Sequence, residues 1–216
     1  MANAVHVIVF AKAPVAGLAK TRLIPALGAT GAARLAASML KHAVEQALSS
    51  GVGTVEVCVT PAPQEPTWLG LLPNHAALSL SDQGQGDLGE RMARAAQRAL
   101  DAGHPVLLMG TDCPDLSAER IRMAAQALLT NDAALVPAFD GGYVLLALNR
   151  FDASLFHDIA WSTPSVAQVT QSRIALLGWR LVTLPTLQDM DEPEDLRWLP
   201  ANWLPAAEDP PRGSTS

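Results

Sequence analysis

The sequence predicts an α/β protein in which a mixed, mostly parallel sheet lies between two layers of helices. Short apolar runs such as residues 5–10 and 106–109 have the composition of strands that are buried on both faces. Segments with helical spacing alternate with these runs, as in the series Leu35, Met39, Ala43 and Ala47. The chain has 216 residues, 49% of them hydrophobic, which is enough for one sizeable core.

The remaining elements follow from the same patterns in chain order. Asp140-Gly141-Gly142 is a tight turn between two apolar runs, which indicates that one strand departs antiparallel from the sheet. The proline-rich segment 61–73, which carries Trp68, is expected to be a surface loop or a lid. We expect strands at 5–10, 54–60, 77–80, 106–109, 133–138, 143–148 and 179–184, and helices from Thr30 and at 88–100, 117–129 and 165–177.

Composition limits the classes of function. The formal net charge is −6 and no basic run occurs, so nucleic-acid binding is disfavoured. Cys58 and Cys113 lack the spacing of a disulfide framework or a zinc site. No signal segment and no apolar run of about 18 residues is recognised, so we expect a cytoplasmic protein without membrane contact. As a separate expectation, the protein is a monomer or a homodimer. We assign 1–205 to one domain and the Pro-, Gly- and Ser-rich segment 206–216 to a disordered tail.

An acidic loop follows the strand at 106–109. It contains Asp112 and Asp115 and ends at Ser117, a good N-cap for the next helix. Ligands of open α/β sheets bind outside the carboxyl ends of the strands, and paired carboxylates there suit Mg²⁺ or Mn²⁺ carrying substrate phosphates. The alternative is that both residues only shape the loop and cap the helix.

The loop after the first strand carries three cations around Pro14 and Gly17. Lys12, Lys20 and Arg22 precede a helix whose N-terminus favours anions, so the loop is a candidate phosphate cradle. It is not a Walker A loop, because an alanine precedes the lysine where that motif needs glycine. The alternative is a solvated basic loop.

Two glycine-containing segments have both structural and functional interpretations. In segment 83–91, Asp87 and Glu90 predict a capping box, while Gly86 and Gly89 would allow a close approach by a flat ligand. The segment 140–143 is a turn that would also bring a carboxylate and a phenol to the mouth of the sheet.

The acidic segment 188–196 holds carboxylates on both sides of a helix start. Glu194 and Asp195 lie in the first turn, where the helix dipole favours them regardless of function. Asp189 and Asp191 precede the helix, and at least one of them could complete a metal site with Asp112.

Taken in order, six motifs resemble those of the nucleotide-diphospho-sugar transferase superfamily, which has the Rossmann-like GT-A fold. More narrowly, the chain is similar to a bacterial family of GT-A-like proteins, some of which are labelled arsenosugar-biosynthesis glycosyltransferases. The resemblance runs from about Val5 to Trp198. The motifs are FAKAPVAGLAKTRL, GQGDLGERM, GTDCPDL, PAFDGGYVLLAL, WST and DMDEPEDL.

The resemblance implies a role for each motif. The first loop is similar to the phosphate-binding loop of nucleotidylyltransferases, including phospholactate guanylyltransferases. Asp112 matches the metal ligand of the superfamily, although Asp112 and Asp115 are not spaced as a strict DxD pair. Asp191 resembles the Asp of the DTPEDL segment in cytidylyltransferases, with Glu192 in place of Thr. The implied nucleotide- or phosphate-binding residues are Lys12, Gly17, Lys20, Arg22, Gly86 and Gly89, and the implied sugar or acceptor pocket contains Gly141, Gly142, Tyr143, Trp161, Ser162 and Thr163.

Two reactions fit these residues. In the first, a nucleoside-diphosphate sugar binds with Mg²⁺ or Mn²⁺ on Asp112 and Asp191, and Asp140 orients or deprotonates the hydroxyl of a small acceptor. In the second, a phosphorylated or hydroxyl substrate attacks a nucleoside triphosphate and releases diphosphate, with Lys20 among the groups that stabilise charge. The family resemblance favours glycosyl transfer, whereas the three-cation loop favours nucleotidyl transfer. A catalytically silent nucleotide-binding protein is a third hypothesis.

Overall fold

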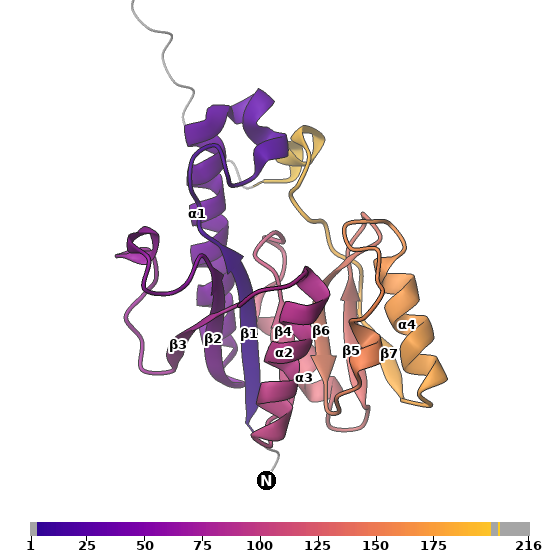
Figure 1. The fold of residues 1–216 in the computed structure, drawn as a ribbon. Coiled ribbons are helices and arrows are strands. Elements are labelled where there is room, and N and C mark those ends of the chain that lie inside the picture. Colours follow the sequence, from indigo (N-terminus) through magenta and orange to yellow (C-terminus); the bar gives the residue numbers. More distant parts are fainter. Residues whose placement is uncertain (1–3, 200–202, 204–216) are drawn as a thin grey trace, which may run out of the picture.

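The computed structural model describes residues 4–199 and 203, and its centre is a seven-stranded sheet (Figure 1). The strand order is β3-β2-β1-β4-β6-β5-β7. Among the described strands only β6 is antiparallel to its neighbours, which confirms the predicted mixed, mostly parallel sheet. The strands are β1 Val5–Lys12, β2 Gly53–Thr60, β3 Leu78–Asp82, β4 Val106–Met109, β5 Ala133–Pro137, β6 Tyr143–Leu148 and β7 Leu181–Thr183.

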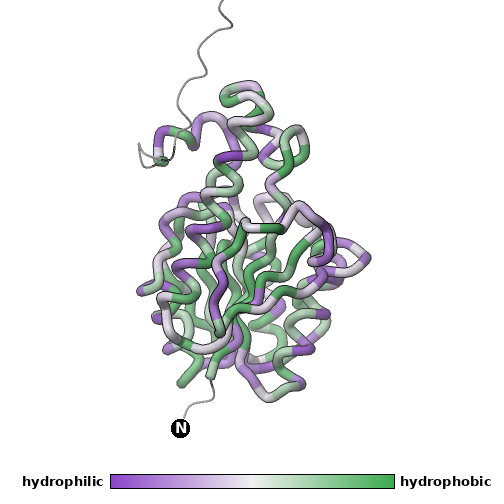
Figure 2. Tube along the Cα trace, turned by 90° about the vertical axis from the view of Figure 1, so that its left-hand side faces the viewer, coloured by the Kyte–Doolittle hydropathy of each residue, from purple (hydrophilic) through white to green (hydrophobic). Residues whose placement is uncertain are grey.

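Helices cover both faces of this sheet (Figure 1). One face packs against Ala43 and Ala47 of α1 and against Ile121 of α3, all of which are buried. The other face packs against Met92 of α2 and Ile174 of α4. Figure 2 shows the hydrophobic stretches along the strands in the middle of the body. The helices are α1 Ile24–Ser50, α2 Leu88–Asp101, α3 Ala118–Ala127 and α4 Val166–Leu176.

Several element boundaries differ from the sequence-based expectation. α1 begins at Ile24 and consists of two helical parts that meet at a kink at Gly28 (φ 68°, ψ 165°). The long part therefore starts close to the predicted position, but Thr30 lies in its first turn and is not its cap. A positive φ of this size suits glycine, which has no Cβ to clash with the backbone. Segment 61–73 contains a short 3-10 helix, and the indole of Trp68 is buried with Nε1 donating to Pro61 O at 2.9 Å.

One helical segment is more apolar than expected. Thr21–Ser50 has a mean hydropathy of 1.3 over its most apolar window and is long enough to cross a membrane by length and composition, contrary to the expectation that no run approaches that length. The structure accounts for this composition, because Leu35, Met39 and Val44 are buried in packed clusters of the fold. Of this window 39% is buried inside the fold, so part of its apolar surface packs within the protein.

The predicted end of the domain at 205 and the predicted tail at 206–216 lie outside the described residues. Within the described part, the helix starts predicted for α2 and α3 are confirmed. The capping box of α2 is complete, since Glu90 N donates to Asp87 Oδ1 and Asp87 N donates to Glu90 Oε2, both at 2.9 Å. Ser117 Oγ accepts from Arg120 N at the start of α3.

Candidate functional site

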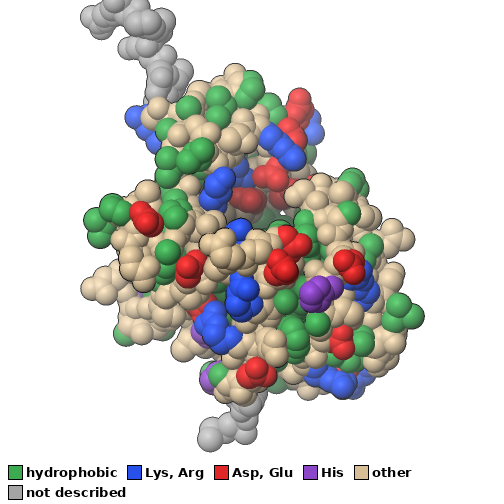
Figure 3. Space-filling model, in the orientation of Figure 1, with side chains coloured by type: hydrophobic (Ala, Val, Ile, Leu, Met, Phe, Trp, Pro, Cys, Tyr) green, Lys and Arg blue, Asp and Glu red, His purple; other side chains and the backbone are tan. Residues whose placement is uncertain are grey.

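A cavity of about 520 Å³, hereafter the main cavity, lies at the carboxyl ends of β1 and β4. Figure 3 shows acidic side chains gathered in a hollow at this end of the molecule, with basic side chains around it. The position agrees with the general rule for ligand sites in open α/β sheets. The predicted site residues that line the main cavity are Lys12, Lys20, Arg22, Asp112, Asp140, Ser162 and Asp191.

Two acidic segments that are far apart in the sequence meet at this cavity. Asp112 follows β4, and its carbonyl oxygen accepts a hydrogen bond from Met190 N at 2.8 Å. Met190 is buried among residues of α1, which holds the segment in place. The adjacent Asp191 is thereby placed beside Asp112. Asp115, by contrast, is exposed and does not line the main cavity.

Lys20 joins the two carboxylates. Its Nζ lies 2.7 Å from Asp112 Oδ1 and 2.8 Å from Asp191 Oδ1, and it also donates to Met190 O at 2.5 Å. The Lys20 side chain is only 8% exposed. Burial lowers the pKa of Lys20, but the two carboxylates raise it by more, so the ammonium stays charged. Lys20 has a left-handed backbone (φ 47°), which is uncommon for a residue with a side chain.

The donor atoms around Lys20 Nζ fit a hard divalent cation that also binds phosphate. The side chains of Asp112 and Asp191 are partly exposed, at 48% and 40%. One oxygen of each lies beside the same point, which the ammonium of Lys20 occupies. No cluster of three or more His, Cys, Asp or Glu side chains suited to a metal ion occurs in the described residues. Mg²⁺ is commonly held by one or two carboxylates with substrate phosphates and waters completing its shell. Two carboxylates that face the main cavity match that requirement.

The three loop cations do not form one cluster. Lys20 faces the acidic residues, and Arg22 Nη1 lies 3.0 Å from Glu192 Oε1 at the surface. Lys12 is exposed at the end of β1 and makes no ion pair within the described residues. The charge available to a ligand from this loop is therefore smaller than the sequence suggests.

Asp140 lies where three cavities meet. It lines the main cavity, an acidic cavity of about 160 Å³, and an apolar cavity of about 220 Å³, hereafter the apolar chamber. Its Oδ1 accepts from Gly142 N at 2.7 Å, which orients the carboxylate. The acidic cavity also contains Asp189, which is 8% exposed; burial and the nearby Asp140 raise the pKa of Asp189 to about 6.

The predicted acceptor residues come together around the apolar chamber. Tyr143 and Trp161 pack edge to face with ring centroids 6.5 Å apart. Gly141 has φ 91°, and a Cβ there would lie 2.1 Å from Pro164 O, so only glycine lets the two loops meet. Of the predicted acceptor residues, Gly142, Tyr143, Trp161, Ser162 and Thr163 line the apolar chamber.

The three glycines assigned to nucleotide binding have local structural explanations. A Cβ at Gly89 would lie 2.2 Å from Phe156 O and 2.7 Å from Trp161 Nε1. Gly86 (φ 104°) packs against Glu90 of the capping box. Gly17 has φ 81° with open space around it, so its role is to shape the loop. None of the three lines the main cavity.

Sequence reasoning missed two residues that shape the main cavity. Gln83 is buried, and its Nε2 donates to Ala11 O at 3.1 Å and to Cys58 O at 2.9 Å, which ties β1 and β2 to the segment after β3. Arg91 lines the cavity and donates from Nη1 to Gln83 Oε1 at 3.3 Å. Arg91 belongs to the GQGDLGERM motif and Gln83 precedes it, but only the fold shows that both line the main cavity.

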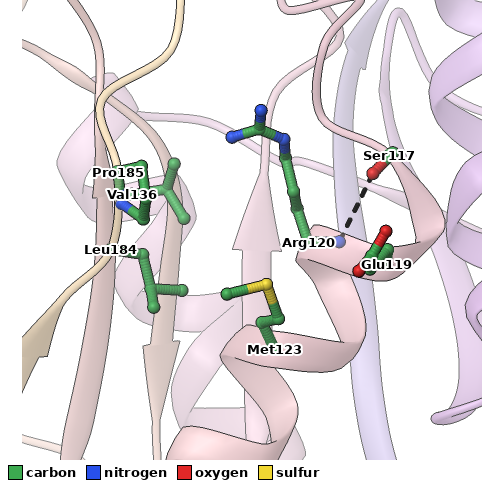
Figure 4. Close-up of a pocket in the computed structure, with 7 residues that line it drawn as sticks. All are labelled: Ser117, Glu119, Arg120, Met123, Val136, Leu184 and Pro185. Carbon is green, nitrogen blue, oxygen red and sulfur yellow. Dashed lines mark hydrogen bonds between the residues drawn. The ribbon is translucent and has the colours of Figure 1, made fainter.

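A further cavity of about 270 Å³ lies away from these residues, between α3 and the end of β5 (Figure 4). Its walls are Met123, Val136, Leu184 and Pro185, and the Arg120 side chain extends along one side. No predicted site residue lines it. This space is hereafter called the reference cavity.

Comparison with known proteins relates this arrangement to a fold family. No curated protein matches the chain. It is 32% identical to a protein of Desulfovibrio desulfuricans G20 that is provisionally named a nucleotide-diphospho-sugar transferase, with a TM-score of 0.79 over 89% of this chain and 84% of that one.

Two more distant structures share the fold alone. Rv0371c of Mycobacterium tuberculosis H37Rv, in complex with manganese, has a TM-score of 0.51 and 15% identity over 94% of this chain and 99% of that one. CMP:2-keto-3-deoxy-manno-octonic acid synthetase, in complex with CTP, has a TM-score of 0.53 and 11% identity over 90% and 96%.

The family model described as "Uncharacterized protein conserved in bacteria (DUF2064)" matches residues 43–163, which is more than half of the chain. The relative with 32% identity and its provisional name support a transferase that uses a nucleotide. The chain therefore belongs to the DUF2064 family and has the fold of the nucleotide-diphospho-sugar transferases.

Proposed function

We propose that this protein is a metal-dependent glycosyltransferase that uses a nucleoside-diphosphate sugar as its donor. The observation that carries the proposal is the convergence of Asp112 Oδ1 and Asp191 Oδ1 on Lys20 Nζ, at 2.7 and 2.8 Å, inside the main cavity. Such a position suits a cation that is shared by two carboxylates and a diphosphate.

Asp112 and Asp191 would hold Mg²⁺ or Mn²⁺. When bound, the ion supplies positive charge that stabilises the departing nucleoside diphosphate. Without a ligand, the ammonium of Lys20 neutralises the two carboxylates and lies where the ion would bind. Lys12, the exposed cation at the end of β1, lines the main cavity and would contact the donor phosphates.

Asp140 is assigned as the base because it lines both the main cavity and the apolar chamber. In the transfer step, the acceptor oxygen forms a bond to the anomeric carbon of the donor sugar. The bond between that carbon and the diphosphate oxygen breaks, and the nucleoside diphosphate leaves with the electron pair. The hydroxyl proton passes to an oxygen of Asp140.

Glycosyl transfer is preferred to nucleotidyl transfer because of the pairing of the loop cations. Lys20 and Arg22 each face an acidic partner, which leaves less counter-charge for a triphosphate than three free cations would supply. The relative with 32% identity also has a name in the sugar-transferase class. We further infer a cytoplasmic location, where nucleoside-diphosphate sugars are made.

The test is a thermal-shift panel of nucleoside-diphosphate sugars and nucleoside triphosphates, with and without Mn²⁺. A ligand at about 100 times its Kd should stabilise the wild type by roughly 2.7 kcal/mol, which raises Tm by a few degrees. Asp112→Asn should lose the metal-dependent shift. Asp115→Asn is the matched control, because Asp115 lies in the same loop but outside the cavity, and it should keep the shift.

Each result has a defined meaning. A metal-dependent shift with one nucleoside-diphosphate sugar supports glycosyl transfer and identifies the donor. A shift with a triphosphate alone would replace the proposal with nucleotidyl transfer. A shift that Asp112→Asn retains in full would contradict the assignment of the metal site.

A further inference from the structure

The apolar chamber is a separate compartment that opens beside the main cavity. The two share Phe10, Leu88, Asp140 and Ser162, so a ligand that spans both would pass between these residues. Beyond this opening, the chamber lies between the sheet and the helices α2 and α4 that cover one of its faces. Its walls are formed chiefly by Met92, Leu108, Tyr143, Trp161 and Val166.

The walls are held in place by contacts that are independent of any ligand. Trp161 lies between Tyr143, with ring centroids 6.5 Å apart, and Gly89, where an added Cβ would lie 2.7 Å from Trp161 Nε1. Gly141 O accepts from Ala167 N at 2.9 Å, which fastens the turn before β6 to α4. The chamber is thus a pre-formed space with a fixed mouth at Asp140.

Charge separates the two compartments. Four cationic side chains line the main cavity, namely Lys12, Lys20, Arg22 and Arg91. The only charged residue that lines the apolar chamber is Asp140. Its other polar side-chain groups are the hydroxyls of Tyr143, Ser162 and Thr163 and the indole N–H of Trp161, which is buried without a hydrogen-bond partner among the described residues. A phosphate in the chamber would face a carboxylate without a cation, and a ring with many hydroxyls would place some of them against the apolar side chains of Met92, Leu108 and Val166.

The size of the chamber sets the size of its occupant. Its volume is about 220 Å³. An apolar cavity of about 150 Å³ accommodates benzene, so the chamber can take one ring with a few further carbon atoms.

We propose that the apolar chamber binds the acceptor, and that the acceptor is an uncharged alcohol whose apolar or aromatic end fills the chamber while its hydroxyl lies at Asp140. The identification of this alcohol as the acceptor depends on the glycosyl transfer proposed above. The binding of an uncharged apolar alcohol does not, because it requires neither nucleotide nor metal.

The experiment measures binding of benzyl alcohol, with glycerol 3-phosphate as the anionic comparison, in the absence of nucleotide and metal. Protein labelled with ¹⁵N-tryptophan reports through the indole signal of Trp161, which Trp161→Phe assigns. Val166→Phe adds a ring inside the chamber. Val136→Phe makes the same change in the reference cavity of Figure 4 and is the matched control, since both valines are buried at 5% and 2% exposure.

Benzyl alcohol is expected to move the Trp161 signal, with affinity at least tenfold weaker in Val166→Phe and unchanged in Val136→Phe. Glycerol 3-phosphate is expected to leave the signal in place. The proposal is overturned if benzyl alcohol does not move the signal, if Val166→Phe binds it as well as the wild type, or if glycerol 3-phosphate moves it equally.

The wild-type titration keeps the proposal testable even if Val166→Phe fails to fold. Failure here is also distinct from failure of the proposed function. If benzyl alcohol binds but no nucleoside-diphosphate sugar raises Tm, glycosyl transfer alone is refuted. If a nucleoside-diphosphate sugar raises Tm but benzyl alcohol does not bind, the chamber assignment alone is refuted.

Discussion

Lys20 and Asp112 form an ion pair of 2.7 Å inside the main cavity, and the same ammonium lies 2.8 Å from Asp191. In this arrangement the lysine occupies a position between the two carboxylates that are proposed to hold the metal. The positive charge of Lys20 and a divalent cation must therefore share, or compete for, the same oxygens.

Lys20→Met is expected to tighten binding of Mn²⁺ to the nucleotide-free protein by about fivefold, because removal of one nearby positive charge is worth on the order of 1 kcal/mol at a partly exposed site. Mn²⁺ titrations followed by electron paramagnetic resonance measure this. Arg22→Met is the control, since its partner Glu192 is a different acid at the surface, and it should change the affinity little. Weaker Mn²⁺ binding in Lys20→Met would place the metal elsewhere.

Glu56 is the centre of a buried ionic network in β2 and should control stability at acid pH. Its side chain is 4% exposed and accepts from His6 Nε2 at 2.8 Å, from Arg98 Nη1 and Nη2 at 2.9 and 2.6 Å, and from Ser81 Oγ. Burial raises the pKa of Glu56, but hydrogen bonds from His6, Arg98 and Ser81 lower it by more, to about 2.

Because the folded pKa of Glu56 lies below its unfolded value of 4.5, the stabilisation is complete above pH 4.5 and is lost as the pH falls toward 2. Its size is on the order of 3 kcal/mol. Glu56→Gln should lower the free energy of unfolding at pH 7 by a similar amount and should flatten its dependence on pH between 4.5 and 2. Urea unfolding at several pH values measures both effects. Glu119→Gln, at an exposed position of α3, should leave both unchanged.

The elements that the sequence predicts well are those determined by local patterns. β4 and β6 have the predicted bounds, because each is a short apolar run that ends at a clear turn or loop. The antiparallel pairing of β5 with β6 follows from the turn at Asp140, which is too short for a crossover connection. The sequence also indicated Asp112, since it follows a buried strand directly.

Features that depend on long-range packing were not predictable in this way. The contact of Lys20 with Asp191 joins residues that are 171 positions apart. The sequence suggested a cluster of loop cations, whereas the fold pairs Arg22 with Glu192. The sequence predicts that Gly89 binds a ligand, but its close neighbours are Phe156 and Trp161. These residues approach Gly89 because α2 packs beside the loop at 156–161.

Gly141 is expected to be essential for the junction between the turn at 140–142 and the loop at 161–164. Gly141→Ala places a Cβ 2.1 Å from Pro164 O at a residue with φ 91°, which should cost roughly 2–4 kcal/mol of stability. Gly178→Ala is the matched control, because Gly178 also has positive φ (68°) but open space around it, and it should cost about 1 kcal/mol. Chemical denaturation of the two variants gives the comparison, and equal losses would show that the close contact does not restrict this position.

Asp140→Asn should separate donor binding from transfer. The amide oxygen of Asn can still accept the hydrogen bond from Gly142 N, so the turn is preserved, but Asn cannot take a proton from the acceptor. We expect kcat to fall by about 10²–10⁴-fold with little change in the metal-dependent thermal shift caused by the donor. Asp112→Asn should show the opposite pattern, with loss of that shift. Steady-state kinetics with the donor identified by the thermal-shift panel measures the effect, and an Asp140→Asn variant with wild-type kcat would exclude Asp140 as the base.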